Sequence, residues 1–215
     1  MDADLVGYYG RRAAEYERIY ARPERQADLG RLQAAVADGF RGRDVLEISC
    51  GTGFWTQSIA PVARSVVGLD LSPEVLEIAR AKAWDAGRVE FMEADSYALP
   101  DLGRKFTAAF AGFWWSHVPR RRLGAFLTGL HSRLQHGATV MFIDNRHVAG
   151  SSTPVSRVDD HGDSFQNRRL DDGSIHEVLK NFPSEAELLG AVAGKASKPK
   201  VILTDYFWVL SYQAP

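Results

Sequence analysis

The stretch that decides the fold is R-D-V-L-E-I-S-C-G-T-G-F-W-T at residues 43–56, a short apolar segment followed by a tight glycine loop. Val45, Leu46 and Ile48 predict a buried strand, and residues 54–56 predict the start of a helix. Glycine suits a backbone that turns sharply or lies against a ligand, because a Cβ would clash there. The free N–H groups of a helix start favour a polar or anionic group. We therefore expect a ligand site here, with an ordinary strand-to-helix turn as the alternative.

The glycine spacing separates two families of nucleotide-binding proteins. The dinucleotide pattern G-x-G-x-x-G requires a third glycine where this chain has Thr56, which argues against an NAD(P)-dependent oxidoreductase. The segment E-I-S-C-G-T-G, with Glu47 four residues before Gly51, instead resembles motif I of the class I S-adenosylmethionine (SAM)-dependent methyltransferases. The resemblance covers about 43–145 and, by topology, 183–212. It implies SAM as cofactor and an α/β fold: a doubly wound, mostly parallel, Rossmann-like sheet of seven strands, with helices on both faces and an antiparallel C-terminal strand.

The composition indicates a single domain over residues 1–215, since 45% of the residues are hydrophobic and can fill one core. Lys and Arg number 26 against 27 Asp and Glu, and this balance predicts neither a nucleic-acid nor a membrane partner. No apolar run approaches the ~18 residues of a membrane span. The sole cysteine, Cys50, cannot form an internal disulfide, which favours a cytoplasmic location. We read it as a small residue in a turn rather than a reactive thiol.

Strand and helix patterns alternate after the glycine loop. The predicted strands are 64–70, 89–92, 105–113 and 138–143, and the predicted helices between them are 73–86 and 120–136, the last ending at Gly137. A capping box, Ser184-x-x-Glu187, starts a helix that runs to about residue 192. The closely connected segments 200–204 and 206–212 predict two antiparallel strands.

Residues 1–40 predict a cap of two helices, interrupted at Pro23. In the family, a Y-Y-x-x-R-A-x-E-Y-like start often lies over the bound cofactor. The resemblance therefore implies that Tyr8, Tyr9 and Tyr16 contact the cofactor. Packing of these rings against the domain is the alternative interpretation.

Acidic residues lie in or near the ends of the first three predicted strands. Asp70 ends the strand beside the glycine loop, where a carboxylate can accept both hydroxyls of a ribose. Because Ser72-Pro73 already supplies a cap for the next helix, we expect Asp70 to be free for that role. Asp95 resembles the family's adenine-contacting residue, with a solvated loop aspartate as the alternative. The resemblance implies that Glu47 orders the loop or meets the cofactor's ammonium group. The full expected cofactor set is Tyr9, Tyr16, Glu47, Ser49, Gly51, Gly53, Asp70, Leu71, Asp95, Ser96 and Phe113.

The segment F-W-W-S-H-V-P at residues 113–119 corresponds to a loop that faces the cofactor's reactive end in the family. We expect Trp114 and Trp115 to form an aromatic wall for a small-molecule acceptor, with core packing as the alternative, since each ring can bury some 150–250 Å². The segment lacks the N-P-P-Y-like motif of enzymes that methylate base or glutamine nitrogens. His117 is the candidate catalytic base, or a capping or packing residue before a proline.

Residues 146–182 depart from the alternating pattern and predict a lid-like insertion, in which Asp171-Asp172-Gly173 is a hairpin signal. Arg157 and Arg169 can bind a carboxylate or phosphate of the acceptor, and Asp144 ends the preceding strand. Surface decoration is the alternative. No metal-ligand spacing is present, so we expect no metal. A non-catalytic SAM-binding or partner-binding module, the acceptor's identity, the methylated atom and the oligomeric state all stay open.

Overall fold

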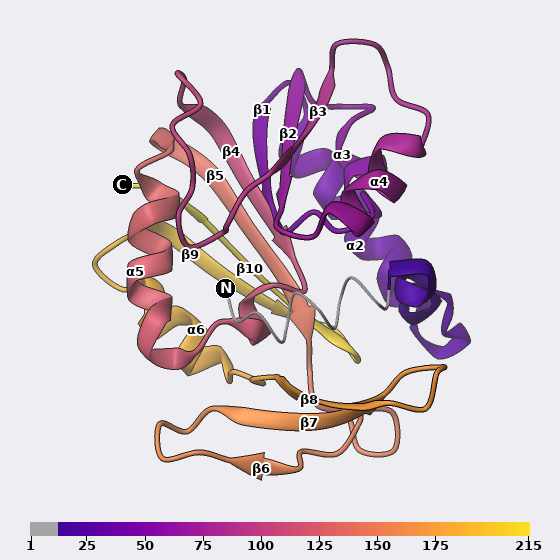
Figure 1. Cartoon of the computed structure of the whole chain (residues 1–215). Coiled ribbons are helices and arrows are strands. Elements are labelled where there is room, and N and C mark those ends of the chain that lie inside the picture. Colours follow the sequence, from indigo (N-terminus) through magenta and orange to yellow (C-terminus); the bar gives the residue numbers. More distant parts are fainter. Residues whose placement is uncertain (1–12) are drawn as a thin grey trace.

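The computed structural model describes residues 13–215, with side chains from Glu17 onward. Its centre is a seven-stranded sheet of order β3-β2-β1-β4-β5-β10-β9 (Figure 1). The strands are β1 (Asp44–Ile48), β2 (Ser65–Asp70), β3 (Val89–Glu93), β4 (Phe106–Gly112), β5 (Leu134–Asn145), β9 (Ser197–Leu203) and β10 (Phe207–Gln213). β10 pairs antiparallel with β5 and β9, and the other pairs are parallel. The predicted fold, with its one antiparallel strand, is confirmed.

Helices cover both faces of this sheet because the central strands are apolar on both sides. In β1, Val45 packs in a cluster with α2 and α3, whereas Leu46 and Ile48 pack in a second cluster with α5 and α6. Such double burial is typical of parallel strands. The helical elements are η1 (Ala13–Ala21), η2 (Pro23–Arg25), α2 (Gln26–Phe40), α3 (Thr56–Ile59), α4 (Pro73–Ala81), η3 (Trp115–His117), α5 (Arg120–His131) and α6 (Glu185–Val192). Within residues 13–215, none is long and apolar enough to cross a membrane.

Two predicted boundaries are wrong, for local reasons. Gly137 does not end a helix: α5 stops at His131, and Gly137, with φ of 74°, lies inside β5, where its N–H bonds to Ala214. The helix α4 ends at Ala81 rather than at residue 86, since the next backbone is extended and the Trp84 indole bonds to a carbonyl of the last turn.

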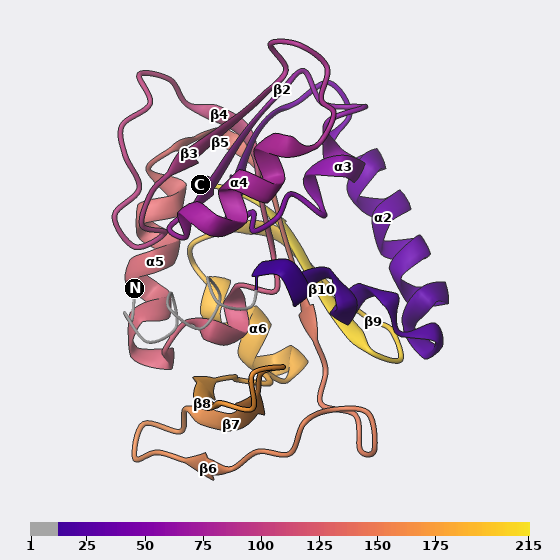
Figure 2. The ribbon, with the colours of Figure 1, turned by 45° about the vertical axis from the view of Figure 1, so that its right-hand side comes forward.

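The insertion forms a second sheet of β6 (Arg157–Val158), β7 (Ser164–Arg169) and β8 (Ile175–Leu179). β7 and β8 pair antiparallel across the predicted Asp171–Gly173 turn, which confirms the hairpin. In both ribbon views this sheet lies beyond one end of the main sheet (Figures 1 and 2). It is therefore placed to complete a site at that end.

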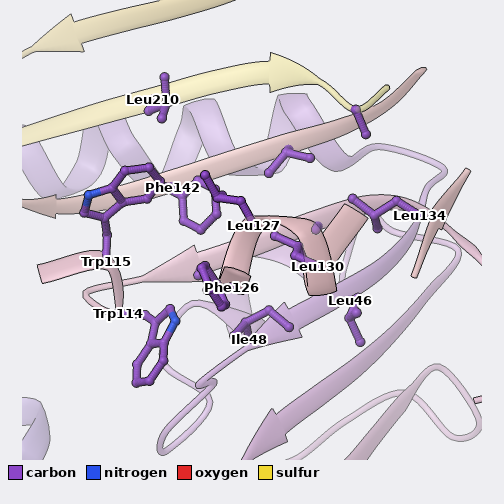
Figure 3. Close-up of a cluster of buried hydrophobic side chains, with 14 of the residues drawn as sticks. Leu46, Ile48, Trp114, Trp115, Phe126, Leu127, Leu130, Leu134, Phe142 and Leu210 are labelled. Carbon is purple, nitrogen blue, oxygen red and sulfur yellow. The ribbon is translucent and has the colours of Figure 1, made fainter. Parts of the chain in front are cut away.

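The two tryptophans after β4 belong to the core. Both are 4% exposed, and Trp114 packs on Phe126 while Trp115 packs on Phe142 (Figure 3). The structure shows the core-packing alternative, so the prediction of an acceptor wall at these positions is wrong. Large rings beside a sheet are more stable under α5 than at an open site, because burial removes their surface from water.

Candidate functional site

The glycine loop lies at the carboxyl end of β1, where the sheet order reverses between β1 and β4. Such reversal points bind ligands in open α/β sheets. Ser49, Gly51 and Gly53 have φ values of 51°, 56° and 76°, so the loop is built from left-handed backbone. The Ser49 hydroxyl lies 2.9 Å from that of Ser96, which ties the end of β1 to the segment after β3.

Asp70 fastens the glycine loop to the end of β2. Its carboxylate accepts hydrogen bonds from the N–H groups of Gly51 (2.9 Å) and Ser72 (3.0 Å). The Ser72 hydroxyl donates to Glu74 instead of capping α4, so the expectation that Ser72 leaves Asp70 free is wrong. Burial raises the pKa of Asp70, and the backbone N–H groups oppose that shift. A carboxylate accepts about four hydrogen bonds, so capacity is left for a ligand. Leu71, the next residue, is half-buried.

Glu47 connects β1 to the start of α3. It is 1% exposed and accepts a 2.6 Å hydrogen bond from the Thr56 hydroxyl. Burial, aided by the nearby Asp70, raises the pKa of Glu47 to about 8 although Thr56 acts in the opposite direction. Of the two expected roles, loop ordering is therefore visible in the structure, and contact with an ammonium group stays a prediction.

The N-terminal segment lies against the glycine loop. Glu17 of η1 accepts from the Thr52 hydroxyl at 2.7 Å and pairs with Lys82 at 2.5 Å. The ring of Tyr20 stacks on Phe54 with centroids 3.5 Å apart. This segment therefore closes one side of the loop.

Three expected cofactor contacts lie outside what the structure describes. Tyr8 and Tyr9 precede the described residues, and only the backbone of Tyr16 is described. Asp95 lies in the turn after β3, where its carboxylate accepts from the N–H of Tyr97 at 2.9 Å. Its adenine role stays a prediction.

A cavity of about 280 Å³ opens beyond the ends of β4 and β5. Its lining comes from the N-terminal segment, the strand ends and the insertion: Ile19, Arg22, Arg25, Phe113, His117, Asn145, Ser151, Ser152, Thr153, Gln166, Asn167, Arg168, Arg169, Lys180 and Phe182. Four of these described residues are arginines, one is lysine, and none is Asp or Glu. The predicted residues Phe113, His117 and Arg169 thus meet here.

Sequence reasoning missed much of this lining. Arg22 and Arg25 flank Pro23, and the polar triplet 151–153 follows β5. The two arginines around Pro23 were the signal that the sequence offered. Only the fold shows that they line a cavity together with residues of β7. Arg157, by contrast, does not line the cavity, so that prediction is wrong: its exposed guanidinium, on β6, pairs with Glu177 of β8 at 2.5 Å.

A buried network supports the cavity floor. The Lys180 ammonium donates to Asp144 at 2.8 Å and to the Ser116 hydroxyl at 2.6 Å. Asp144 is fully buried and also accepts from the N–H of Ser116. It holds Lys180 rather than lining the cavity, which corrects its predicted role as a direct acceptor contact. The opposite charges offset the cost of burying each other.

His117 faces the same cavity in a defined tautomer. Its Nδ1 lies 2.7 Å from the Leu179 carbonyl oxygen, which only accepts, so Nδ1 carries the hydrogen and Nε2 is the basic nitrogen. Burial, together with Lys180 and Arg168, holds the pKa of His117 well below its usual value. The imidazole is therefore neutral at neutral pH, with its Nε2 unprotonated.

Known proteins share this architecture. A family model described as a methyltransferase domain matches residues 45–137, which include the glycine loop, Asp70 and His117. Two solved structures, described as the DhpI–SAH complex and the DhpI–SAM–HEP complex, superpose with TM-scores of 0.78. The second is 30% identical, over 99% of this chain and 96% of that one. The chain belongs to the class I SAM-dependent methyltransferases.

Curated members of this methyltransferase family match a smaller part of the chain. A demethylmenaquinone methyltransferase of Lactococcus lactis is 31% identical over 57% of this chain and 50% of its own length. A ubiquinone biosynthesis O-methyltransferase of a Chelativorans species is 36% identical over 40% of this chain and 34% of its own length. The chain thus spans half or less of these relatives. The matched family domain ends at residue 137, before Asn145, the triplet 151–153 and the insertion.

Proposed function

We propose that this protein transfers a methyl group from SAM to a small-molecule acceptor. One observation carries the proposal: the glycine loop, fastened by Asp70, and a cavity of about 280 Å³ lie at the same edge of a methyltransferase-family sheet. A cofactor on the loop and an acceptor in the cavity would meet near Phe113, which stacks on Tyr20 and lines the cavity.

The loop fits the cofactor's shape and charge. Gly51 and Gly53 would hold the methionine part, Asp70 the ribose and Asp95 the adenine. SAM carries a positive sulfonium that makes its methyl group electrophilic. Asp70 places a carboxylate at this end, whereas the cavity is basic, so a cationic cofactor is favoured at the loop.

The chain's main contribution to the reaction is alignment. Holding two reactants in line can lower a barrier by ~7–11 kcal/mol. Tyr20, Phe54 and Phe113 stack together and form an apolar side to the loop. Where the acceptor atom carries a proton, we assign its removal to Nε2 of His117, which lines the cavity in its neutral form.

The cofactor assignment is tested by calorimetric titration with SAM and with S-adenosylhomocysteine. We expect Asp70→Asn to weaken both affinities at least about tenfold, because an amide replaces the charged acceptor of the ribose hydroxyls. The control is Asp38→Asn, which makes the same change of charge at an exposed position. Equal affinity in Asp70→Asn and wild type would remove the ribose assignment.

Turnover separates an enzyme from a non-catalytic module of the same fold. Incubation with methyl-tritiated SAM and pools of small molecules should release S-adenosylhomocysteine with at least one pool. Tight SAM binding without release from any pool would support the non-catalytic module instead.

A further inference from the structure

Arg25 is the most unusual residue of the cavity. It is 8% exposed, and its guanidinium donates to the Asn145 amide oxygen (3.0 Å) and the Ser151 hydroxyl (2.9 Å). Its Nε is buried with no hydrogen-bond partner among the described residues. Both of its hydrogen bonds go to neutral groups, so they orient the guanidinium without neutralising it. A buried cation in this state favours an anionic ligand.

No carboxylate among residues 17–215 forms an ion pair with Arg25, and Glu24 acts on it only from a distance. Among the same residues, no carboxylate lies within ion-pair distance of Arg169, and Arg22 meets only Glu24, at 3.9 Å. Lys180, 4% exposed, has Asp144 beneath it. The cavity therefore keeps an excess of positive charge, and burial together with Arg22 lowers the pKa of Arg25 although Glu24 acts in the opposite direction.

We propose that the methyl acceptor carries an anionic oxygen group, a carboxylate or a phosphate-type group, that binds in this cavity against Arg25, Arg169 and Lys180. The inference rests on the proposed methyl transfer and names the class of its acceptor. Guanidinium groups bind both kinds of oxyanion through paired N–H donors. The hydroxyls of residues 151–153 add neutral donors on the same wall.

The same lining disfavours two other acceptor classes. A cationic amine would be repelled by Arg25 and Arg169, which meet no carboxylate among residues 17–215, and a ring with a long apolar tail would desolvate them without supplying an anionic partner. An anion, in contrast, would attract the sulfonium of a cofactor bound on the loop beside Asp70. Opposite charges on cofactor and acceptor thus match the opposite charges of the two parts of the site.

Binding of simple anions tests the site directly. Inorganic phosphate and acetate are titrated calorimetrically into the protein saturated with S-adenosylhomocysteine, with glycerol as a neutral probe. We expect phosphate or acetate, but not glycerol, to bind, and the tighter of the two identifies the kind of anion. Arg25→Gln and the exposed Arg169→Gln should each weaken that binding about tenfold. The control Arg41→Gln, at an exposed position just after α2 that does not line the cavity, should leave it unchanged.

Retained affinity for S-adenosylhomocysteine shows that each variant is folded, and Arg169→Gln tests the site even where Arg25→Gln does not fold. Equal anion affinity in wild type and Arg169→Gln and Arg25→Gln would overturn the inference. So would methylation of a neutral or apolar pool at the wild-type rate in these variants, although SAM-dependent transfer itself would then be established. Anion binding without any SAM binding would instead contradict the proposed function and leave the anion site standing.

Discussion

Single buried carboxyl groups control the pH response of the cofactor end. Glu47 has a pKa of about 8 against an ordinary value of 4.5, because burial favours its neutral form. Between these values the folded state binds more protons than the unfolded chain, so stability is fully present at low pH and falls as pH rises.

Glu47→Gln should remove this pH dependence, because glutamine is a neutral isostere that still accepts from Thr56. From pH 5 to pH 7, the variant should gain about 2–3 kcal/mol of unfolding free energy relative to wild type, at about 1.4 kcal/mol per pH unit. Urea unfolding of both proteins across this range measures the difference. A constant difference would show that Glu47 is ionised in the folded protein.

His117 predicts a second, separate pH effect. Because burial and the nearby Lys180 hold the pKa of His117 well below its usual value, the acidic limb of kcat/KM due to this residue should lie well below pH 6.5. His117→Asn keeps a donor for the Leu179 carbonyl but removes the basic nitrogen, so kcat should fall about 100-fold with unchanged S-adenosylhomocysteine affinity. Wild-type kcat in this variant would assign His117 a packing role.

At the scale of elements, the end of β8 is joined to β5 by a buried ion pair. Lys180 follows β8, and Asp144 lies near the end of β5, where it pairs with Trp208 of β10. The small sheet therefore holds its place over the strand ends through a charge pair as well as through backbone contacts such as Asn181 N–H to the Ser116 carbonyl.

Lys180→Met should destabilise the protein by about 3–5 kcal/mol, because it leaves the fully buried Asp144 without its cation. Adding Asp144→Asn should recover part of this loss by removing the stranded charge. Denaturant unfolding measures both, and the exposed Lys200→Met is the control, expected within about 0.5 kcal/mol of wild type. No recovery in the double variant would mean that packing, not charge, holds the segment.

At the scale of the whole molecule, the site has two electrostatic halves. The Asp70 carboxylate stands at the end of β2 beside the glycine loop, and basic side chains gather beyond β4 and β5. The chain's net charge of −1 conceals this division, because composition averages over the surface. A cationic cofactor and an anionic acceptor would each find the half that suits its charge.

Local patterns were sufficient for the sheet but not for the acceptor side. The strands of the main sheet were predictable because buried parallel strands are short apolar runs, and β7–β8 because Asp-Gly favours a hairpin turn. The position of Trp114 and Trp115 was not predictable, because the same loop sequence is compatible with an exposed binding-site wall and with the core. Gly137 was misread because a left-handed glycine serves a bulge as well as a helix end.

The sequence by itself determined the doubly wound fold and the place of the glycine loop, because strand periodicity and left-handed backbone are properties of neighbouring residues. Only the tertiary structure decided that Arg25, Lys180 and Arg169 share one cavity and that Asp70 fastens the loop. These residues come from distant segments, and the charge of a site depends on which side chains the fold brings within reach of one another.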